Sequence, residues 1–544
     1  MKKISNLLMN KKILLILILL LSFVLRFYKL GENPPSLSWD EASLGYNAYS
    51  ISTSGQDEHG ELFPLARFIA FGDYKPPGYI YADSISVKIF NLSEWSIRLP
   101  SAIAGLLMVV FTYLLVLELF QSKNLSLLSA FIMAISPWSL QFSRAAYESN
   151  LAALFNLIAI YLFFLSLRRG SLYLLSTIFF IFSFYTFNAN RIIAPLMLFS
   201  LSIVYIKTLF KNKLWLIVSI IISSLLLLPS FSYLKSKESK LRFQEVSIFN
   251  NLNVIETAND WIAKDGNTSF SKIIHNRRIL YLFDFLKHYS DNFSGRFLFT
   301  HGDVNPRLSI QEMGELYIWD LPFLVIGLYL LYKHKEKGLL PIMIWMLIVP
   351  IPAGTARETP HALRILSILP TYQMIIAYGL YRIILFLRQK SNAKFFYSLL
   401  LVTCLALVLN FYYYLHNYYV HYPVSWSGEW QYGYKEMVSY VSDVEGNYDS
   451  IFITDSLGRP YIYFALYNKY PVNKFLQERK ASRDWFGFWN VSSLGKIQFG
   501  LDDLSNAEGR VLLVTTPGNL PGSYHLLTNI KNLSGDEVFL IAER

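Results

Sequence analysis

The sequence predicts an α-helical protein that crosses a membrane many times. Hydrophobic residues make up 53% of the 544 residues, and charged residues make up 16%, whereas soluble domains carry about 25% charged residues. Long apolar stretches recur between residues 12 and 416, and lysines and arginines gather in short clusters between them. We therefore expect about 11 transmembrane helices, loops outside the membrane and a small C-terminal α/β domain.

Each predicted span is a stretch near the length of about 20 mostly apolar residues that a helix needs to cross a bilayer. The stretches are residues 12–30, 99–120, 125–142, 151–167, 171–187, 192–209, 214–232, 317–332, 338–353, 362–386 and 395–416. The first one has a longer apolar core than a signal peptide, and no small-residue cleavage site follows it. It is therefore predicted to be an uncleaved span.

The basic clusters predict the orientation of these spans. They occur in every second connection: Lys2, Lys3, Lys11 and Lys12; Lys123; Arg168 and Arg169; Lys207, Lys211 and Lys213; Lys333, Lys335 and Lys337; and Arg388, Lys390 and Lys394. Because short cytoplasmic connections are enriched in lysine and arginine, we expect a cytoplasmic N-terminus in a multi-pass protein of the cell membrane. The outer loops 31–98 and 233–316 and the region 417–544 then lie outside the cytoplasm.

The last part of the chain has the pattern of a folded domain rather than of a membrane span. "SIFITD", "RVLLVTT" and "EVFLIAE" are short apolar runs typical of strands, and "RPYIYFALYNKY" is typical of a helix. We therefore expect a transmembrane domain over residues 1–416 and an extracytoplasmic α/β domain over residues 417–544.

Composition excludes several classes of protein. The net charge of +11 is dispersed between apolar runs, so it does not indicate a surface for nucleic acid. Cys404 is the only cysteine, which excludes an intrachain disulfide and a cysteine-based metal cluster. A divalent metal is possible because carboxylates suit it, but no spacing demands one.

Charged residues gather on the side predicted to be outside. "SLSWDEASLGYNAY", Ser36 to Tyr49, places Asp40 and Glu41 directly after the first span. Charges close to hydrocarbon are costly and often serve function. Further charged residues on this side are Lys75, Arg98, Arg144, Glu148, Arg307, Arg357 and Arg364. Arginine and lysine can hold a phosphate, and a carboxylate can act as a general base, so the set suits a lipid-linked phosphate and an acceptor that loses a proton.

Three motifs carry a resemblance to a known family. "WDEASLGYNAY", "DYKPPGYIYA" and "RLPSAIAGLL" follow the first span in this order. In this order they resemble the C-type membrane glycosyltransferase superfamily of protein O-mannosyltransferases and lipid A aminoarabinose transferases. The resemblance is strongest over residues 13–200 and extends through 416. It implies an inverting enzyme that moves a hexosyl or pentosyl group from a polyprenyl-phosphate carrier to a lipid, glycan or protein acceptor on the outer face of the membrane.

The resemblance also implies roles for individual residues. Asp40 would be the base that activates the acceptor, with Glu41 and Glu148 as further acidic candidates, and Lys75 would approach the donor phosphate. The residues themselves add Arg98, Arg307, Arg357 and Arg364 as candidate phosphate contacts. Structural alternatives remain open here, because Lys75 could snorkel to the interface, Arg98 could anchor a helix end, and Arg144 and Glu148 could form an i,i+4 pair.

A transporter or flippase of lipid-linked sugars is the alternative function. Such a protein would carry polar residues near the bilayer midplane on several helices. The charges here gather at one membrane face, which favours the enzyme.

Overall fold

The computed structural model describes residues 10–71, 73–236, 239–240, 246–483 and 489–544. The chain forms two compact units. The first, which we call the helical unit, comprises Met1–Arg26, Ala104–Phe142 and Glu148–Tyr414. The second, which we call the mixed unit, comprises Phe27–Ile103, Ser143–Tyr147 and Leu415–Arg544.

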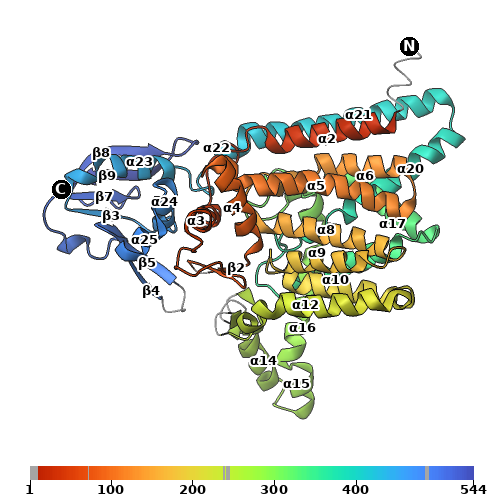
Figure 1. Cartoon of the computed structure of the whole chain (residues 1–544), viewed down its shortest axis with the longest axis horizontal. Coiled ribbons are helices and arrows are strands. Elements are labelled where there is room, and N and C mark those ends of the chain that lie inside the picture. The colour runs from red at the N-terminus through yellow and green to blue at the C-terminus, as the bar shows by residue number, and fades with distance from the viewer. Residues whose placement is uncertain (1–9, 72, 237–238, 241–245, 484–488) are drawn as a thin grey trace. The chain divides into compact units, whose positions relative to one another are not determined.

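The helical unit consists of long apolar helices and a group of shorter ones (Figure 1). Its elements are α2 (Lys11–Phe27), the greater part of α5 (Glu94–Phe120), α6 (Lys123–Ile135), α7 (Pro137–Ser143), α8 (Glu148–Ser166), α9 (Leu172–Phe184), α10 (Asn190–Val204), α11 (Ile206–Leu209), α12 (Lys213–Leu234), α14 (Leu252–Lys264), α15 (Ser269–Ile274), α16 (Arg277–Asp291), α17 (Asp320–Lys333), α18 (Leu339–Ile348), α19 (Ile351–Gly354), α20 (Thr371–Lys390) and α21 (Ala393–His416). Each of the 11 stretches predicted to span the membrane overlaps at least one of these helices.

Among the described residues, five helices are long and apolar enough to cross a membrane, or six if the bent pair α6–α7 counts as one span. The five are Glu94–Phe120, Glu148–Ser166, Ile206–Leu234, Leu366–Lys390 and Ala393–Ser425, and shorter apolar helices cover Leu172–Phe184, Asn190–Val204 and Leu339–Gly354. The predicted fold class is confirmed, and the number of 11 spans stays a prediction.

A buried arginine joins the first helix to the bent pair. Pro137 follows the end of α6, and carbonyl groups at a helix end lack intrahelical partners. Nη1 of Arg26 donates to the carbonyl oxygen of Ala134 at 3.0 Å, and Nη2 donates to Oγ of Ser139 at 2.8 Å. The cation of α2 therefore satisfies groups at the α6–α7 bend.

Two glycines allow α17 and α20 to pack closely. A Cβ atom at Gly327 would lie 2.1 Å from the carbonyl oxygen of Ile375, and one at Gly379 would lie 2.1 Å from that of Phe323. Small residues that allow such close backbone approach are typical of packing between membrane helices.

The mixed unit joins the first outer segment to the C-terminal part of the chain. Its elements are α3 (Trp39–Ser54), β1 (Phe68–Ala70), β2 (Asp73–Lys75), α4 (Gly78–Phe90), the start of α5, α22 (Tyr422–Ser425), α23 (Tyr434–Val444), β3 (Ser450–Ile453), α24 (Pro460–Tyr467), α25 (Val472–Glu478), β4 (Arg479–Arg483), β5 (Trp489–Leu494), β6 (Ile497–Phe499), β7 (Val511–Thr515), β8 (His525–Lys531) and β9 (Glu537–Glu543).

The C-terminal strands form one mixed sheet in the order β4-β5-β6-β3-β7-β9-β8. Strands β6, β3 and β7 are parallel, with Ile451 opposite Ile497 and Leu512, and the outer pairs are antiparallel. Central parallel strands are covered on both faces and therefore read as apolar runs. The predicted strands 450–455, 510–516 and 537–543 and the predicted helix 459–470 are confirmed as β3, β7, β9 and α24.

The compact units do not follow the expected division at residue 416. Residues 27–103 and 143–147 group with the C-terminal region. Two hydrogen bonds show why: Oη of Tyr463 donates to the carbonyl oxygen of Leu37 at 3.0 Å, and the Trp39 N–H donates to Oε1 of Gln431 at 3.2 Å. The segment after α2 and the C-terminal domain thus pack as one body.

Candidate active site

Asp40 and Glu41 lie in the first turn of α3, and a capping box fixes that turn. Oγ of Ser38 accepts from the Glu41 N–H at 3.3 Å, and the Ser38 N–H donates to Oε2 of Glu41 at 3.1 Å. This reciprocal pair satisfies two backbone donors at the helix start, where negative side chains are also favoured. The local sequence therefore places both carboxylates in the first turn of α3.

The Glu41 carboxylate is occupied by the protein. Its side chain is 3% exposed. Oε1 accepts from Nε of Arg98 at 2.9 Å and from the Ala146 N–H at 2.9 Å. Oε2 accepts from Nη2 of Arg98 at 3.2 Å in addition to the Ser38 N–H. With four hydrogen bonds inside the protein, this group is poorly placed to act on a substrate.

Arg98 was expected to contact a donor phosphate, and its geometry differs from that expectation. The side chain is completely buried. Nη1 donates to the carbonyl oxygens of Leu30 at 3.1 Å and Pro34 at 2.8 Å, and Nη2 donates to that of Ser36 at 2.5 Å. Together with the two bonds to Glu41, these contacts use all five guanidinium N–H groups. Arg98 thus joins α5 to the segment that leads into α3.

Asp40 presents a contrast to its neighbour Glu41. Its side chain is 43% exposed, and Oδ1 accepts from Nζ of Lys75 at 2.9 Å. The Lys75 side chain is only 6% exposed. Lys75 is the last residue of β2, and it pairs with Phe68 of β1 in a hairpin. The structure therefore brings together the two residues expected to act on acceptor and donor.

Arg144 and Glu148 do not share a helix. Helix α7 ends at Ser143, and α8 begins at Glu148, which is buried. Nε of Arg144 donates to Oη of Tyr418 at 3.1 Å, and Nη2 donates to the carbonyl oxygen of Asn33 at 3.0 Å. Arg144 is thus a second buried arginine that holds the segment after the first span, and Glu148 occupies a helix start that suits a carboxylate.

A further carboxyl group, Asp83, lies in α4 of the same unit. It is completely buried, and neither carboxylate oxygen has a hydrogen-bond partner among the described residues. Burial and the nearby Glu41 charge raise its pKa well above the usual value. The same environment disfavours the charged form of the Asp83 carboxyl group.

The C-terminal domain supports the residue beside Asp40, a contact that the sequence analysis missed. Gly458 has a φ of +126°, and a Cβ there would lie 2.6 Å from Cε3 of Trp39. The loop after β3 thus closes directly against the Trp39 ring. A glycine in the loop after a parallel strand is by itself a weak signal of such a contact. Trp39, which Gly458 contacts, lies more than 400 residues away in the chain.

The remaining basic candidates lie in the helical unit, and Asp303 joins two of their loops. Oδ2 of Asp303 accepts from the Ala362 N–H at 2.7 Å, which connects the loop of Arg307 with that of Arg364. Nη1 of Arg364 donates to the carbonyl oxygen of Glu358 at 3.2 Å. Burial raises the pKa of Asp303 to about 6, although backbone hydrogen bonds and Arg364 oppose this rise.

Arg357 and His361 complete this loop region. Arg357 is exposed, and its Nε donates to the carbonyl oxygen of Ser247 at 3.3 Å. Burial and the charge of Arg364 lower the pKa of His361 well below its usual value. Within the described parts of the chain, no three His, Cys, Asp or Glu side chains are grouped so that they could hold a metal ion.

The fold has known structural relatives. ArnT from Cupriavidus metallidurans in the apo state matches with a TM-score of 0.55 and 13% identity, over 97% of both chains. The archaeal oligosaccharyltransferase AglB from Archaeoglobus fulgidus matches with a TM-score of 0.51 and 14% identity, over 84% of this chain and 63% of AglB. The chain therefore shares its fold with these two proteins, and these identities show the fold alone.

The sequence comparison is more specific. Residues 16–244 match the family model of dolichyl-phosphate-mannose-protein mannosyltransferases. YkcB of Bacillus subtilis (strain 168), named as a candidate mannosyltransferase, is 31% identical over 172 residues, which are 31% of this chain and 23% of YkcB. A protein of Aquifex aeolicus (strain VF5) is 31% identical over 159 residues, 29% of this chain and 30% of that protein. The chain thus covers less than a third of either relative, and the resemblance read from the motifs is confirmed.

Proposed function

We propose that the protein is an inverting glycosyltransferase that moves a sugar from a polyprenyl-phosphate carrier to an acceptor. The observation that carries this proposal is the difference between the two adjacent carboxylates. Glu41 has both oxygens occupied inside the protein, whereas Asp40 is partly exposed and is paired with the buried Lys75. A base and a cation side by side are what transfer from a phosphate requires.

The proposed reaction follows from these two groups. Asp40 takes the proton of the acceptor hydroxyl or amine while the acceptor atom attacks the anomeric carbon. The bond between that carbon and the phosphate oxygen breaks, and the carrier phosphate leaves with the electron pair. The Lys75 ammonium stabilises the charge that develops on this oxygen. Glu41 and Arg98 hold the start of α3, Arg144 holds the segment before it, and Glu148 is a second acidic candidate.

The relatives support this choice of donor. ArnT of the same fold has been crystallised with undecaprenyl phosphate, and AglB with an inhibitory peptide and a dolichol-phosphate. The matching family is named for dolichyl-phosphate-mannose as donor and protein as acceptor. For this chain we propose a hexosyl or pentosyl donor and a lipid, glycan or protein acceptor.

Purified protein in lipid nanodiscs, incubated with a panel of polyprenyl-phosphate sugars, tests the function. We expect release of the sugar-free carrier phosphate to increase when the matching acceptor is present. Transport of an intact lipid-linked sugar across vesicles without carrier release would contradict the proposal and support a flippase.

Basic residues should determine donor affinity. If Lys75, Arg357 and Arg364 contact the carrier phosphate, then Lys75→Ala, Arg357→Lys and Arg364→Lys should each weaken donor binding by about tenfold or more, since charge-assisted hydrogen bonds contribute about 1.5–3 kcal/mol. Donor titration in nanodiscs measures this. Lys531→Ala, at an exposed position on β8, is the control. Wild-type affinity in all three variants would move the phosphate site elsewhere, with Arg307 as the next candidate.

The orientation is a proposal that rests on the alternating basic clusters. A Cys404→Ser protein with Ser523→Cys should react with an impermeant thiol reagent in intact cells, because Ser523 is exposed in the C-terminal domain. The matched variant Lys211→Cys, in a basic connection, should react only after permeabilisation. The reverse pattern would place the candidate site on the cytoplasmic side.

A further inference from the structure

The loop that follows α12 contains a helical extension, which we define as Ile248–Asp291. It was expected to be an outer loop, and the structure shows three helices in it: α14, α15 and α16. Each begins at a capping side chain, with Asn251, Thr268 and Asn276 each accepting a hydrogen bond from a backbone N–H two or three residues later. Such caps are an established start signal, so the helices are encoded locally.

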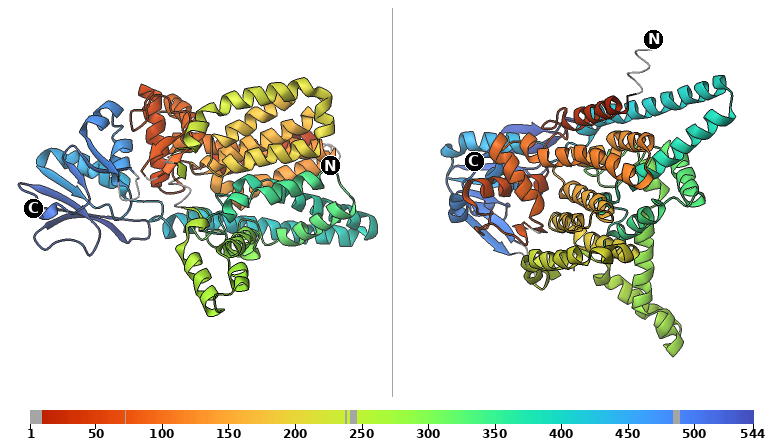
Figure 2. Two further views of the ribbon diagram at one scale, coloured as in Figure 1. Left: turned by 90° about the horizontal axis from the view of Figure 1, so that it is seen from below. Right: turned by 45° about the vertical axis from the view of Figure 1, so that its right-hand side comes forward.

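Helix α16 and the first residue of the extension fasten it to the rest of the helical unit, since the Ile248 N–H donates to the carbonyl oxygen of Thr355 at 3.0 Å. Nδ1 of His288 lies 2.7 Å from the carbonyl oxygen of Ala356, and Oη of Tyr289 donates to that of Leu347 at 2.8 Å. Helices α14 and α15 reach outward from this attachment, transverse to α12, as Figures 1 and 2 show. A helix that crosses a membrane lies roughly along the membrane normal. Because the extension lies at the end of α12 and is transverse to that helix, the extension runs along the membrane surface.

The extension leaves large apolar side chains uncovered. They recur at helical spacing on α15 and α16, and Phe270 is 70% exposed. The exposed set is Phe249, Leu252, Trp261, Phe270, Ile273, Ile274, Leu282, Phe283 and Leu286. Exposed apolar surface of this extent marks contact with a membrane or a partner, and amphipathic helices with tryptophan, phenylalanine and leucine on one face are typical of the lipid interface.

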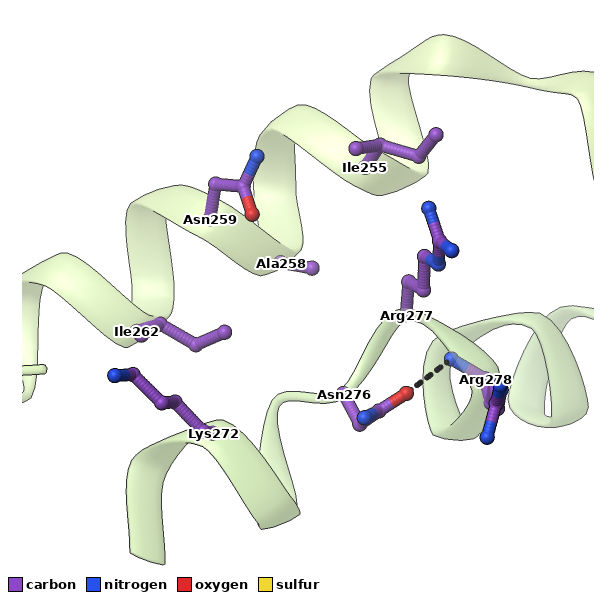
Figure 3. Close-up of a pocket in the computed structure, with 8 residues that line it drawn as sticks. All are labelled: Ile255, Ala258, Asn259, Ile262, Lys272, Asn276, Arg277 and Arg278. Carbon is purple, nitrogen blue, oxygen red and sulfur yellow. Dashed lines mark hydrogen bonds between the residues drawn. The ribbon is translucent and has the colours of Figure 1, made fainter. Parts of the chain in front are cut away.

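A pocket with basic walls lies between these helices (Figure 3). Lys272 and Arg277 extend toward α14, and Ile255, Ala258 and Ile262 form its apolar side. Lys272, Arg277 and Arg278 form no ion pair with a carboxylate anywhere in the described residues, whereas the neighbouring His275 and Lys287 bond Asp265 and Asp291.

The position of the two arginines also indicates an anion. Arg277 and Arg278 are the first two residues of α16. Positive side chains at a helix start face the positive end of the helix dipole and are unfavourable there. An anion in the pocket would relieve this repulsion and would also meet the backbone N–H groups of the first turn.

We propose that the helical extension lies on the membrane surface and that its pocket binds the phosphate of an anionic phospholipid. The guanidinium of Arg277 and the ammonium of Lys272 contact the headgroup phosphate, Arg278 adds positive charge at the same helix start, and the exposed apolar side chains enter the acyl region. A lipid supplies both the anion and the apolar environment, whereas free phosphate supplies only the first. This site is separate from sugar transfer.

Native mass spectrometry of the full chain from phosphatidylcholine nanodiscs containing phosphatidylglycerol tests the pocket. Arg277→Gln/Arg278→Gln should lower retention of phosphatidylglycerol by about tenfold or more. Lys264→Gln/Lys287→Gln removes two charges from the same extension outside the pocket and should leave retention unchanged. Equal retention in both variants overturns the proposal, as does displacement of the lipid by inorganic phosphate at equal concentration.

A second measurement tests the membrane contact and does not depend on pocket chemistry. An environment-sensitive dye on Phe270→Cys, in a Cys404→Ser background, should be quenched by lipids brominated in their acyl chains. The same dye on Ser523→Cys, in the C-terminal domain, should not be quenched. Absence of quenching at position 270 would show that the apolar face is not in lipid and would overturn the proposal, whereas sugar transfer would be unaffected by either result.

Discussion

An Asp40→Asn variant should fold and bind the donor but lose sugar transfer. Asparagine has nearly the same shape and can still accept the hydrogen bond from Lys75 Nζ, which lies 2.9 Å from Oδ1 in the wild type. It cannot take the proton of the acceptor, and loss of general-base catalysis typically lowers rate by about 10²–10⁴-fold. The measurement is carrier release per mole of protein, together with donor affinity and the midpoint of thermal unfolding.

The matched control for this experiment is Asp502→Asn. Asp502 is an exposed carboxylate in the C-terminal domain, and it has no part in the proposed site, so turnover should stay at the wild-type level. Turnover close to wild type in a stable Asp40→Asn protein would remove Asp40 from the role of base. Loss of donor binding in that variant would instead assign Asp40 to the donor side of the site.

The features that could be predicted from sequence are those encoded by nearby residues. The apolar runs predicted the helices because a transmembrane span is one continuous stretch of sequence. The strands β3, β7 and β9 were predicted from short apolar runs. The place of Asp40 followed from the motif after the first span. The ion pair of Asp40 with Lys75 was not predicted, because 35 residues separate the two in the chain.

The features that could not be predicted depend on contacts between distant parts of the chain. Arg98 was interpreted as a phosphate contact because nothing in the sequence shows that Leu30, Pro34 and Ser36 present their carbonyl groups to it. The contact of Gly458 with Trp39 is equally invisible. The helical extension is different, because its capping asparagines and its helical periodicity were readable in a segment that was interpreted as a loop.

The Arg98–Glu41 pair should contribute more to stability than any other single contact described here. Glu41→Gln would leave a buried guanidinium without its counter-charge, and removal of one partner of a buried ion pair typically costs about 3–5 kcal/mol. Arg98→Lys keeps the charge but replaces five N–H groups with three on one atom. It cannot reach Glu41 and the carbonyl groups of the 30–36 segment together, so we expect a comparable loss.

Glu94→Gln is the matched control for these variants. Glu94 lies near Arg98 at the start of α5, and in its ion pair with Lys435 the side chains are 20% and 57% exposed. Exposed pairs contribute less than about 1 kcal/mol, so the midpoint of thermal unfolding should change little. If Glu41→Gln instead unfolds at the wild-type midpoint and loses transfer, then Glu41 acts on the substrate and the assignment of the base to Asp40 fails.

A double-mutant cycle separates a positioning pair from two independent roles. Glu41→Gln and Arg98→Gln each leave one buried partner unmatched, whereas the double variant leaves no buried charge from this pair. The double variant should therefore lose less stability than the sum of the two single losses, with a coupling energy of about 1–3 kcal/mol.

The double variant should keep donor affinity if Arg98 makes no contact with the phosphate, because the N–H groups of Arg98 all donate to protein atoms. Its transfer rate should still fall, since the turn that carries Asp40 loses its fixed orientation, and a geometric error of this kind lowers rate without removing a reacting group. Additive losses of stability together with weaker donor binding would show that Arg98 contacts the carrier phosphate, as the sequence alone suggested.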